Sequence, residues 1–204
     1  MESPIGDASR GLYGETVGNP VSQVFFNFGW HNLFCSRAVR LRLTPPPASV
    51  AQAERILAKY NEGVFACTPL EVSRGNADCT PIAFGNILRR RVPTSSAILF
   101  GCAPSDVAQL TKFIGAMNLS HAFDIVTEPL PVWKAIVDAA AGYVTGNSCG
   151  MWLAVASRTA TELLQHSDPT HRHNSMWDFK TEWNCPNIKL VAPEHEPKCN
   201  RGAI

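Results

Sequence analysis

Residues 142–150, Gly142-Tyr143-Val144-Thr145-Gly146-Asn147-Ser148-Cys149-Gly150, lie in the most apolar part of the chain and fit two mutually exclusive structures. In a continuous helix, glycines four residues apart form one flat face that lets another backbone approach closely. The same stretch contains Gly-x-Ser-x-Gly, which needs a sharp turn between a strand and a helix at Ser148. The first structure predicts a protein that packs against partners, and the second predicts an acyl-transfer enzyme.

The enzyme interpretation makes Ser148 the candidate nucleophile, with the backbone N–H of Cys149 facing an oxyanion. Over Val144 to Ala156 the chain resembles the nucleophile elbow of α/β hydrolases, and this resemblance implies a small serine hydrolase or acyltransferase. The partners Asp168, His171 and His173 follow in a suitable order. However, a helix leaving the elbow would carry Asp168 more than about 20 Å away, at about 1.5 Å per residue. The sequence therefore lacks a complete triad.

The helical interpretation makes Gly142, Gly146 and Gly150 a contact surface, flanked on the same stripe by Asp138 and Arg158. Each glycine costs about 1 kcal/mol in a helix interior relative to alanine, so only close packing would offset them. Residues 145–150 have equally the composition of a loop, which we slightly favour.

Composition excludes several classes of protein. The chain has 204 residues, of which 45% are hydrophobic, so it can bury a core and is not largely disordered. Its net charge of +1 gives no global attraction to nucleic acid or anionic membranes. The seven cysteines form no Cys-x-x-Cys pair, and the N-terminus reads as neither a secretory signal nor a transit peptide. We therefore expect an intracellular protein, and leave association with an organelle membrane open through the apolar stretch Ala135–Ala156.

The pattern of apolar residues predicts an α-rich α+β fold, with a small α/β unit in residues 97–165. We expect an N-terminal arm at 1–21, a globular domain at 22–165 and an irregular C-terminal extension at 166–204. Helices are predicted over 51–60, 81–91, 105–117, 131–141 and 151–165, and short strands over 39–43, 64–67, 97–102 and 123–126.

Metal and cofactor binding have weak support. The polar C-terminal part gathers metal-ligand residue types at His171, His173, Cys185, His195 and Cys199. Structural zinc sites need two closely spaced ligand pairs, and only the histidine pair has clear spacing of that kind. We expect no metal and no cofactor.

Two further groups are candidate contact residues. The basic residues Arg40, Arg42, Arg89, Arg90 and Arg91 are interpreted as a solvated surface, since near-zero net charge argues against nucleic-acid binding. The large apolar residues Trp177, Phe179 and Trp183 stand in a polar segment and must be buried on this chain or on a neighbour. We interpret them as anchors.

These observations lead to one functional expectation and two alternatives. Polar terminal arms are ordered only when something holds them, which favours a non-catalytic accessory or structural subunit of a multi-protein complex, with other protein subunits as partners. The first alternative is the Ser148 hydrolase or acyltransferase. The second is a viral coat or nucleic-acid-packaging protein. The sequence gives no information on a small-molecule ligand.

Overall fold

The computed structural model describes residues 43–71, 76–77, 80–146, 149–164 and 185–191. Within them, the main sheet is formed by β1 (Val64–Thr68), β4 (Ala97–Gly101), β5 (Phe123–Val126), β6 (Gly142–Thr145), β7 (Thr161–Leu164) and β8 (Ile188–Val191). All neighbouring strands in this sheet are parallel, in the order β5-β4-β1-β6-β7-β8. This is the order of a doubly wound Rossmann-like α/β fold. The expected α-rich α+β fold is therefore wrong.

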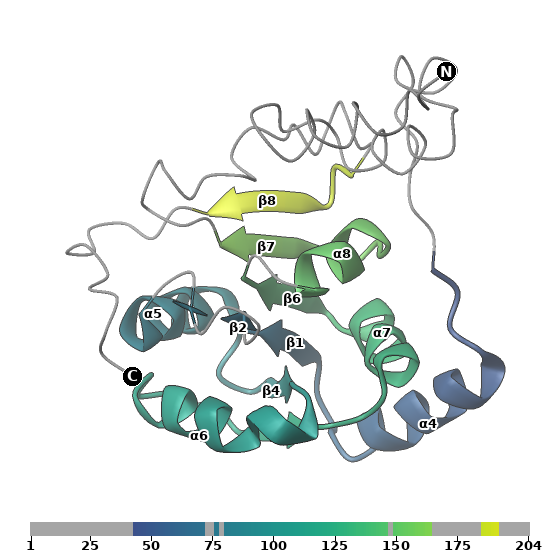
Figure 1. Cartoon of the computed structure of the whole chain (residues 1–204), viewed down its shortest axis with the longest axis horizontal. Helices are drawn as coiled ribbons and strands as arrows, with labels where there is room; N and C mark the ends of the chain where they lie inside the picture. The colour runs from purple at the N-terminus through teal and green to yellow at the C-terminus, as the bar shows by residue number, and fades with distance from the viewer. Residues whose placement is uncertain (1–42, 72–75, 78–79, 147–148, 165–184, 192–204) are drawn as a thin grey trace, which may run out of the picture.

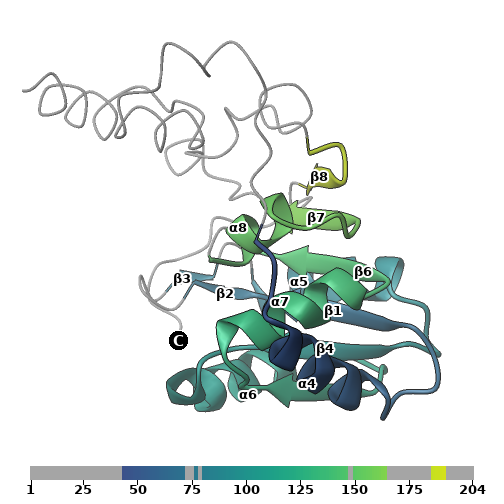
Figure 2. The same cartoon turned by 90° about the vertical axis from the view of Figure 1, so that its right-hand side faces the viewer.

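Helices cover both faces of the sheet (Figures 1 and 2). One face carries α5 (Pro81–Arg91) and α6 (Val107–Gly115), with the 3₁₀ turn Pro104–Asp106 before α6. The other face carries α4 (Pro47–Leu57), α7 (Leu130–Ala139) and α8 (Cys149–Val155). Between β1 and α5, β2 (Leu70–Glu71) and β3 (Asn76–Ala77) pair as a small antiparallel ribbon. The central sheet is thus the middle layer of three.

The strands are buried on both faces, which explains why the sequence shows no alternation of polar and apolar residues there. In β4, Leu99 belongs to the core beneath α4, α7 and α8, whereas Ile98 and Phe100 belong to the core beneath α5 and α6. In β6, Tyr143 belongs to the core beneath α4, α7 and α8, and Val144 belongs to the core beneath α5 and α6. Strands of this kind appear as short, continuous apolar runs, which are easily assigned to buried helices.

Local signals explain where several helices begin. Thr80 caps α5 through its hydroxyl, which accepts a hydrogen bond from the Ala83 N–H at 3.4 Å, and Pro81 occupies the first turn. Prolines also open α4 and α7, where a missing N–H costs nothing. The helix expected over 51–60 begins earlier, at Pro47.

The region interpreted as one glycine-rich helix is divided into α7, β6 and α8. Gly142 begins β6, Gly146 follows it and Gly150 lies in α8, so the three glycines do not form one face. Gly142 is needed for another reason: a Cβ there would overlap the ring of Phe65 on the neighbouring strand. The helix expected over 151–165 is also wrong, since β7 occupies its second half.

Two further findings concern the C-terminal extension and membrane association. Strand β8 lies within 166–204, where we expected irregular chain. Among the described residues, none of the helices combines the length and apolar character that crossing a bilayer requires.

Candidate functional site

The topology singles out one place on the molecule. Strands added after β1 extend the sheet in one direction through β4 and β5, whereas β6, β7 and β8 extend it in the other. The connections therefore diverge at the carboxyl ends of β1 and β6, where α/β proteins of this type bind their ligands.

Three neighbouring strands end there in a row of small or hydroxyl-bearing residues, Gly101 on β4, Thr68 on β1 and Thr145 on β6. Thr68 is directly opposite Thr145, and it follows the pair formed by Cys67 and Phe100, which places it beside Gly101. By alternation along the strands, the row faces the same side as Leu99, Ala66 and Tyr143, namely the side of α7 and α8. We call Gly101, Thr68 and Thr145 the hydroxyl row.

Hydrogen bonds join β1 and β6 at this row. The Tyr143 hydroxyl donates to Thr68 Oγ1 at 2.9 Å, and the Gly146 N–H donates to the Thr68 carbonyl at 3.0 Å. Thr145 Oγ1 lies 3.2 Å from the same carbonyl and 3.1 Å from the carbonyl of Gly146. These bonds fix the positions of the hydroxyls, and Thr68, Tyr143 and Thr145 are all buried beneath α8.

Helices α7 and α8 approach the row through two glycines. A Cβ on Gly101 would overlap the indole of Trp133 in α7, and a Cβ on Gly150 in α8 would overlap the hydroxyls of Thr145 and Tyr143. Gly101 and Gly150 thus permit close packing of helix on strand, the role of a glycine in nucleotide-binding α/β proteins. The fingerprint Gly-x-Gly-x-x-Gly is absent from residues 64–80, between β1 and α5.

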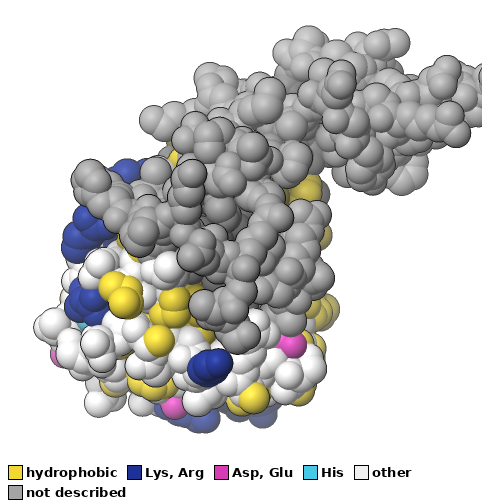
Figure 3. All heavy atoms as spheres, turned by 60° about the vertical axis from the view of Figure 1, so that its left-hand side comes forward, with side chains coloured by type: hydrophobic (Ala, Val, Ile, Leu, Met, Phe, Trp, Pro, Cys, Tyr) yellow, Lys and Arg dark blue, Asp and Glu magenta, His cyan; other side chains and the backbone are white. Residues whose placement is uncertain are grey.

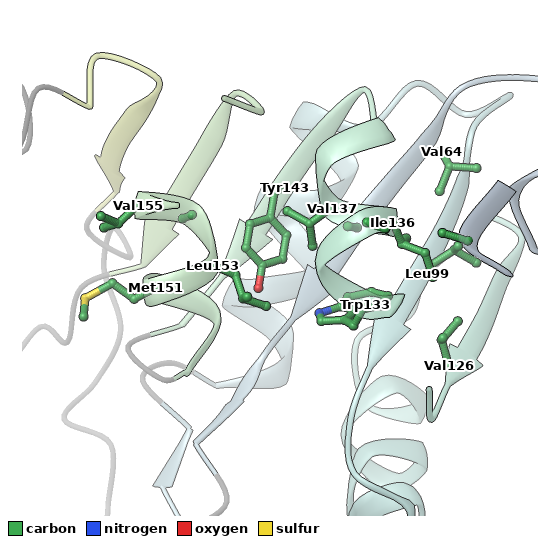
Figure 4. Close-up of a cluster of buried hydrophobic side chains, with 14 of the residues drawn as sticks. Val64, Leu99, Val126, Trp133, Ile136, Val137, Tyr143, Met151, Leu153 and Val155 are labelled. Atoms are coloured by element: carbon green, nitrogen blue, oxygen red, sulfur yellow. The ribbon is translucent and has the colours of Figure 1, made fainter. Parts of the chain in front are cut away.

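Trp133 contributes the feature of the site that most needs explanation. Trp133 is 6% exposed, and its indole nitrogen Nε1 has no hydrogen-bond partner among the described residues. Figure 4 shows this nitrogen on the side of the ring that faces the hydroxyl of Tyr143. A buried donor left unpaired costs about 1–3 kcal/mol, so such groups often mark a functional contact.

The thiol beside the row is not suited to nucleophilic catalysis. Cys102 follows β4, and burial raises the pKa of its thiol, as does the nearby carboxylate of Asp106. The thiol is therefore protonated at neutral pH, and the thiolate is the reactive form.

The predicted site residues are distributed differently from our expectation. Ser148 lies outside the described residues, as do His171, His173, His195, Cys199, Trp177, Phe179, Trp183, Arg40 and Arg42. Cys185 is buried, and its thiol donates to the carbonyl of Val155 at 3.6 Å. In the part of the chain that the structure describes, no cluster of three or more metal-ligand side chains occurs.

The arginines of α5 have structural contacts. Arg89 donates from Nη1 to the carbonyls of Met117 and Asn118 at 2.7 and 2.9 Å, which fastens α5 to the end of α6. Arg91 pairs with the buried Glu162 of β7, with Nε 3.0 Å from Oε1. On the face drawn in Figure 3, Lys and Arg side chains form separate groups rather than one continuous stripe.

Sequence analysis missed the hydroxyl row, although a weak signal was present. Thr68 and Thr145 each end a short apolar run, as Gly101 does in β4. The three residues become neighbours only through the strand order, which the sequence did not reveal.

Comparisons with known proteins agree with this topology. Neither a protein-family model nor a curated protein sequence matches the chain. Among solved structures, it is similar to a family 9 glycosyl transferase from Veillonella parvula, with a TM-score of 0.64 and 9% identity over 87% of this chain and 50% of that chain. It is also similar to ADP-heptose LPS heptosyltransferase II from E. coli, with a TM-score of 0.53 and 11% identity over 74% of this chain and 44% of that chain.

The chain therefore spans about half the length of the structures it matches. These structures are of glycosyltransferases, and they give no support to a non-catalytic accessory subunit, so that expectation is corrected. The hydrolase and coat-protein alternatives find no support in them either. What the comparisons establish for this chain is its fold, a Rossmann-like α/β unit of the kind found in glycosyltransferases.

Proposed function

We propose that this chain is the nucleotide-sugar-binding unit of a glycosyltransferase. The observation that carries the proposal is the prearranged hydroxyl row at the switch point between β1 and β6. Ligands of doubly wound sheets bind at the carboxyl ends of the strands at this point. Hydroxyl and indole groups are suited to the many oxygen atoms of a nucleotide sugar.

The nature of the ligand follows from the local chemistry and from the neighbouring structures. A nicotinamide or flavin dinucleotide is a poorer candidate, because residues 64–80 lack the glycine fingerprint that lets β1 and its helix approach a pyrophosphate. One similar structure is that of an ADP-heptose heptosyltransferase. An ADP-sugar is therefore the first ligand to test.

The proposal concerns binding of the donor, because the chain spans about half of the enzymes it resembles. Transfer also needs an acceptor hydroxyl and a group that removes its proton. Asp106 and Glu128 follow β4 and β5 at the same edge of the sheet, but Glu128 already accepts a hydrogen bond from Gln52 at 2.7 Å. We assign neither of them a catalytic role.

Isothermal titration calorimetry of the full chain with ADP-glucose, UDP-glucose and NAD tests the proposal. We expect saturable binding of at least one sugar nucleotide, with a Kd between about 1 µM and 1 mM, the usual range of enzyme substrates. NAD should bind more weakly or not at all. Tight binding of NAD alone, or the failure of every sugar nucleotide to bind, would contradict the proposal.

A further inference from the structure

Trp133 differs from the buried hydroxyl groups of the neighbouring hydroxyl row because its hydrogen-bond donor has no partner among the described residues. Among the described residues, His121 Nδ1 is the other buried side-chain atom without a partner. His121 lies just before β5, at the amino ends of the strands and therefore away from the hydroxyl row. Its Nε2 is 3.0 Å from the carbonyl of Val92. The indole of Trp133 has a single donor and no acceptor, so nothing else on the ring compensates for it.

The position of the indole is fixed by its packing. The six-membered part of the ring lies against the backbone of Gly101, in the place that a Cβ would occupy. Phe84, Leu88 and the other residues of the α5–α6 core are on the far side of the sheet, so they cannot provide an acceptor. In Figure 4 the nitrogen lies on the side of the ring toward the hydroxyl of Tyr143.

The side chains of the hydroxyl row are uncharged. Thr68 Oγ1 accepts the hydrogen bond of Tyr143, which leaves the proton of the Thr68 hydroxyl available for donation. Trp133 and Thr68 together can therefore provide two neutral donors at the end of β1. Such a pair suits a hydroxyl oxygen of a sugar ring better than a phosphate group, which is usually bound by cations or by several backbone N–H groups.

On the basis of the proposed function, we propose that Trp133 is a specificity residue. Its indole N–H donates to a hydroxyl oxygen of the bound nucleotide sugar. Thr68 donates to the same ring. The oxygen belongs either to the ribose or to the transferred sugar, and the two sources share the same chemistry. Binding then provides the acceptor that the buried N–H lacks.

The geometry also indicates how the ligand reaches the indole. In this structure protein atoms cover Nε1, so the ligand reaches it only after the protein around the indole has opened. The end of the α7–α8 pair away from Thr145 is fixed, because Ser157 donates to Asp138 of α7 at 2.8 Å. For the ligand to reach the indole, the short helix α8 would tilt about that end.

The test uses ¹H–¹⁵N NMR of the indole groups in the full chain, which has five tryptophans. Trp133→Phe assigns the Trp133 signal, and ADP and ADP-glucose are then titrated into the unsubstituted protein. We expect the Trp133 indole proton to shift downfield on saturation. A shift with ADP assigns the acceptor to the ribose, whereas a shift with ADP-glucose alone assigns it to the transferred sugar.

Affinity provides a second, independent readout. Trp133→Phe keeps the aromatic packing on Gly101 but removes the donor, and should weaken ADP-glucose binding about three- to tenfold, as expected for one neutral hydrogen bond. The matched control is Trp152→Phe, the same change in α8 at a side chain that is 36% exposed. The control should bind as the unsubstituted protein does.

The results of these experiments distinguish a failure of the role of Trp133 from a failure of the proposed function. If ADP-glucose binds while the Trp133 signal stays fixed and Trp133→Phe binds equally well, the role of Trp133 is wrong and the proposed function stands. If neither ADP nor ADP-glucose binds to the folded protein, both the proposed function and the role of Trp133 are overturned.

Discussion

The two ends of the α7–α8 pair differ in how their polar groups are satisfied. At the amino edge of the sheet, Lys134 Nζ contacts Asp138 Oδ1 at 2.6 Å, and Asp138 also accepts from Ser157. The chain of hydrogen bonds continues from Ser157 to Thr159, and from Thr159 to the carbonyl of Val137 at 2.6 Å. At the carboxyl edge, the hydroxyl row is held by a few bonds and Trp133 keeps an unused donor.

This contrast separates groups that stabilise the fold from groups that are arranged for binding. A fully satisfied polar network rigidifies its surroundings, whereas an unpaired buried donor reduces stability. The amino end therefore acts as a fixed joint between α7 and α8, and the carboxyl end as the site. Substitutions at the two ends should affect different measurements.

The largest effect is expected from Gly150→Ala. Its Cβ would overlap the hydroxyls of Thr145 and Tyr143, both fully buried, so α8 would be displaced from the row. We expect a loss of about 3 kcal/mol in the free energy of unfolding, measured by urea denaturation, because overpacking a close contact is costly.

The control for this substitution is Gly115→Ala in α6. A Cβ at that position would contact nothing within 4 Å. It should be neutral or stabilise the protein by roughly 0.5–1 kcal/mol through helix propensity. Equal stability of the two variants would show that α8 does not pack on the row as described.

Asp138→Ala should break the fixed joint. It would leave Lys134, whose side chain is 5% exposed, buried without its carboxylate. We expect a loss of about 2 kcal/mol in the free energy of unfolding, below the usual range for buried pairs because Asp138 itself is 37% exposed.

The double variant Lys134→Met/Asp138→Ala tests the cause of that loss. Removing the charge together with its partner should recover most of the stability, since an apolar pair leaves no unpaired ion. If the double variant is less stable than Asp138→Ala, the buried charge is not the reason. ADP-glucose affinity should change less in these variants than in Trp133→Phe.

Thr68→Val tests the carboxyl end of the α7–α8 pair, where the hydroxyl row lies. Valine has nearly the shape of threonine but cannot accept from Tyr143 or donate to a ligand. We expect a loss of about 1 kcal/mol in stability together with weaker ADP-glucose binding, measured by denaturation and calorimetry. A loss of stability without any change in affinity would mean that the row is purely structural.

The smallest expected effect is a pH dependence of stability that arises at Tyr60, outside both ends of the α7–α8 pair. Tyr60 donates to Asp124, and burial, followed by this hydrogen bond, raises the pKa of the Tyr60 hydroxyl above its ordinary value of 10.0. The unfolded chain therefore loses this proton first, and stability should begin to fall as the pH rises above about 10. In Tyr60→Phe this part of the decline, followed by circular dichroism, should be absent.

The sequence predicted those elements whose signals are local. The Thr80–Pro81 start of α5 and the strand at 123–126 were recognised correctly, because a cap, a proline or a bounded apolar run marks them. Strand β7 was missed because the four residues Thr161–Leu164 continue an apolar stretch that also fits a helix. Its strand conformation depends on pairing with β6 and β8.

The candidate site could not be predicted for a related reason. Thr68 and Thr145 are 77 positions apart in sequence, and their contact depends on β6 pairing with β1 across the switch point. The Gly146–Gly150 spacing was noticed, but it was interpreted as a loop, a helix stripe or a nucleophile elbow. Only the sheet order shows that Gly150 serves the packing of α8 on the hydroxyl row.

The most direct test of the account is the ¹H–¹⁵N spectrum of the full chain during titration with ADP-glucose. We predict saturable shifts concentrated in Thr68, Thr145, Gly146 and the Trp133 indole, while Asp138, Ser157 and Thr159 at the opposite end of the α7–α8 pair remain unchanged. Shifts centred on the Asp138–Ser157 joint, or a spectrum that does not change at millimolar ADP-glucose, would contradict the assignment of the carboxyl end as the site.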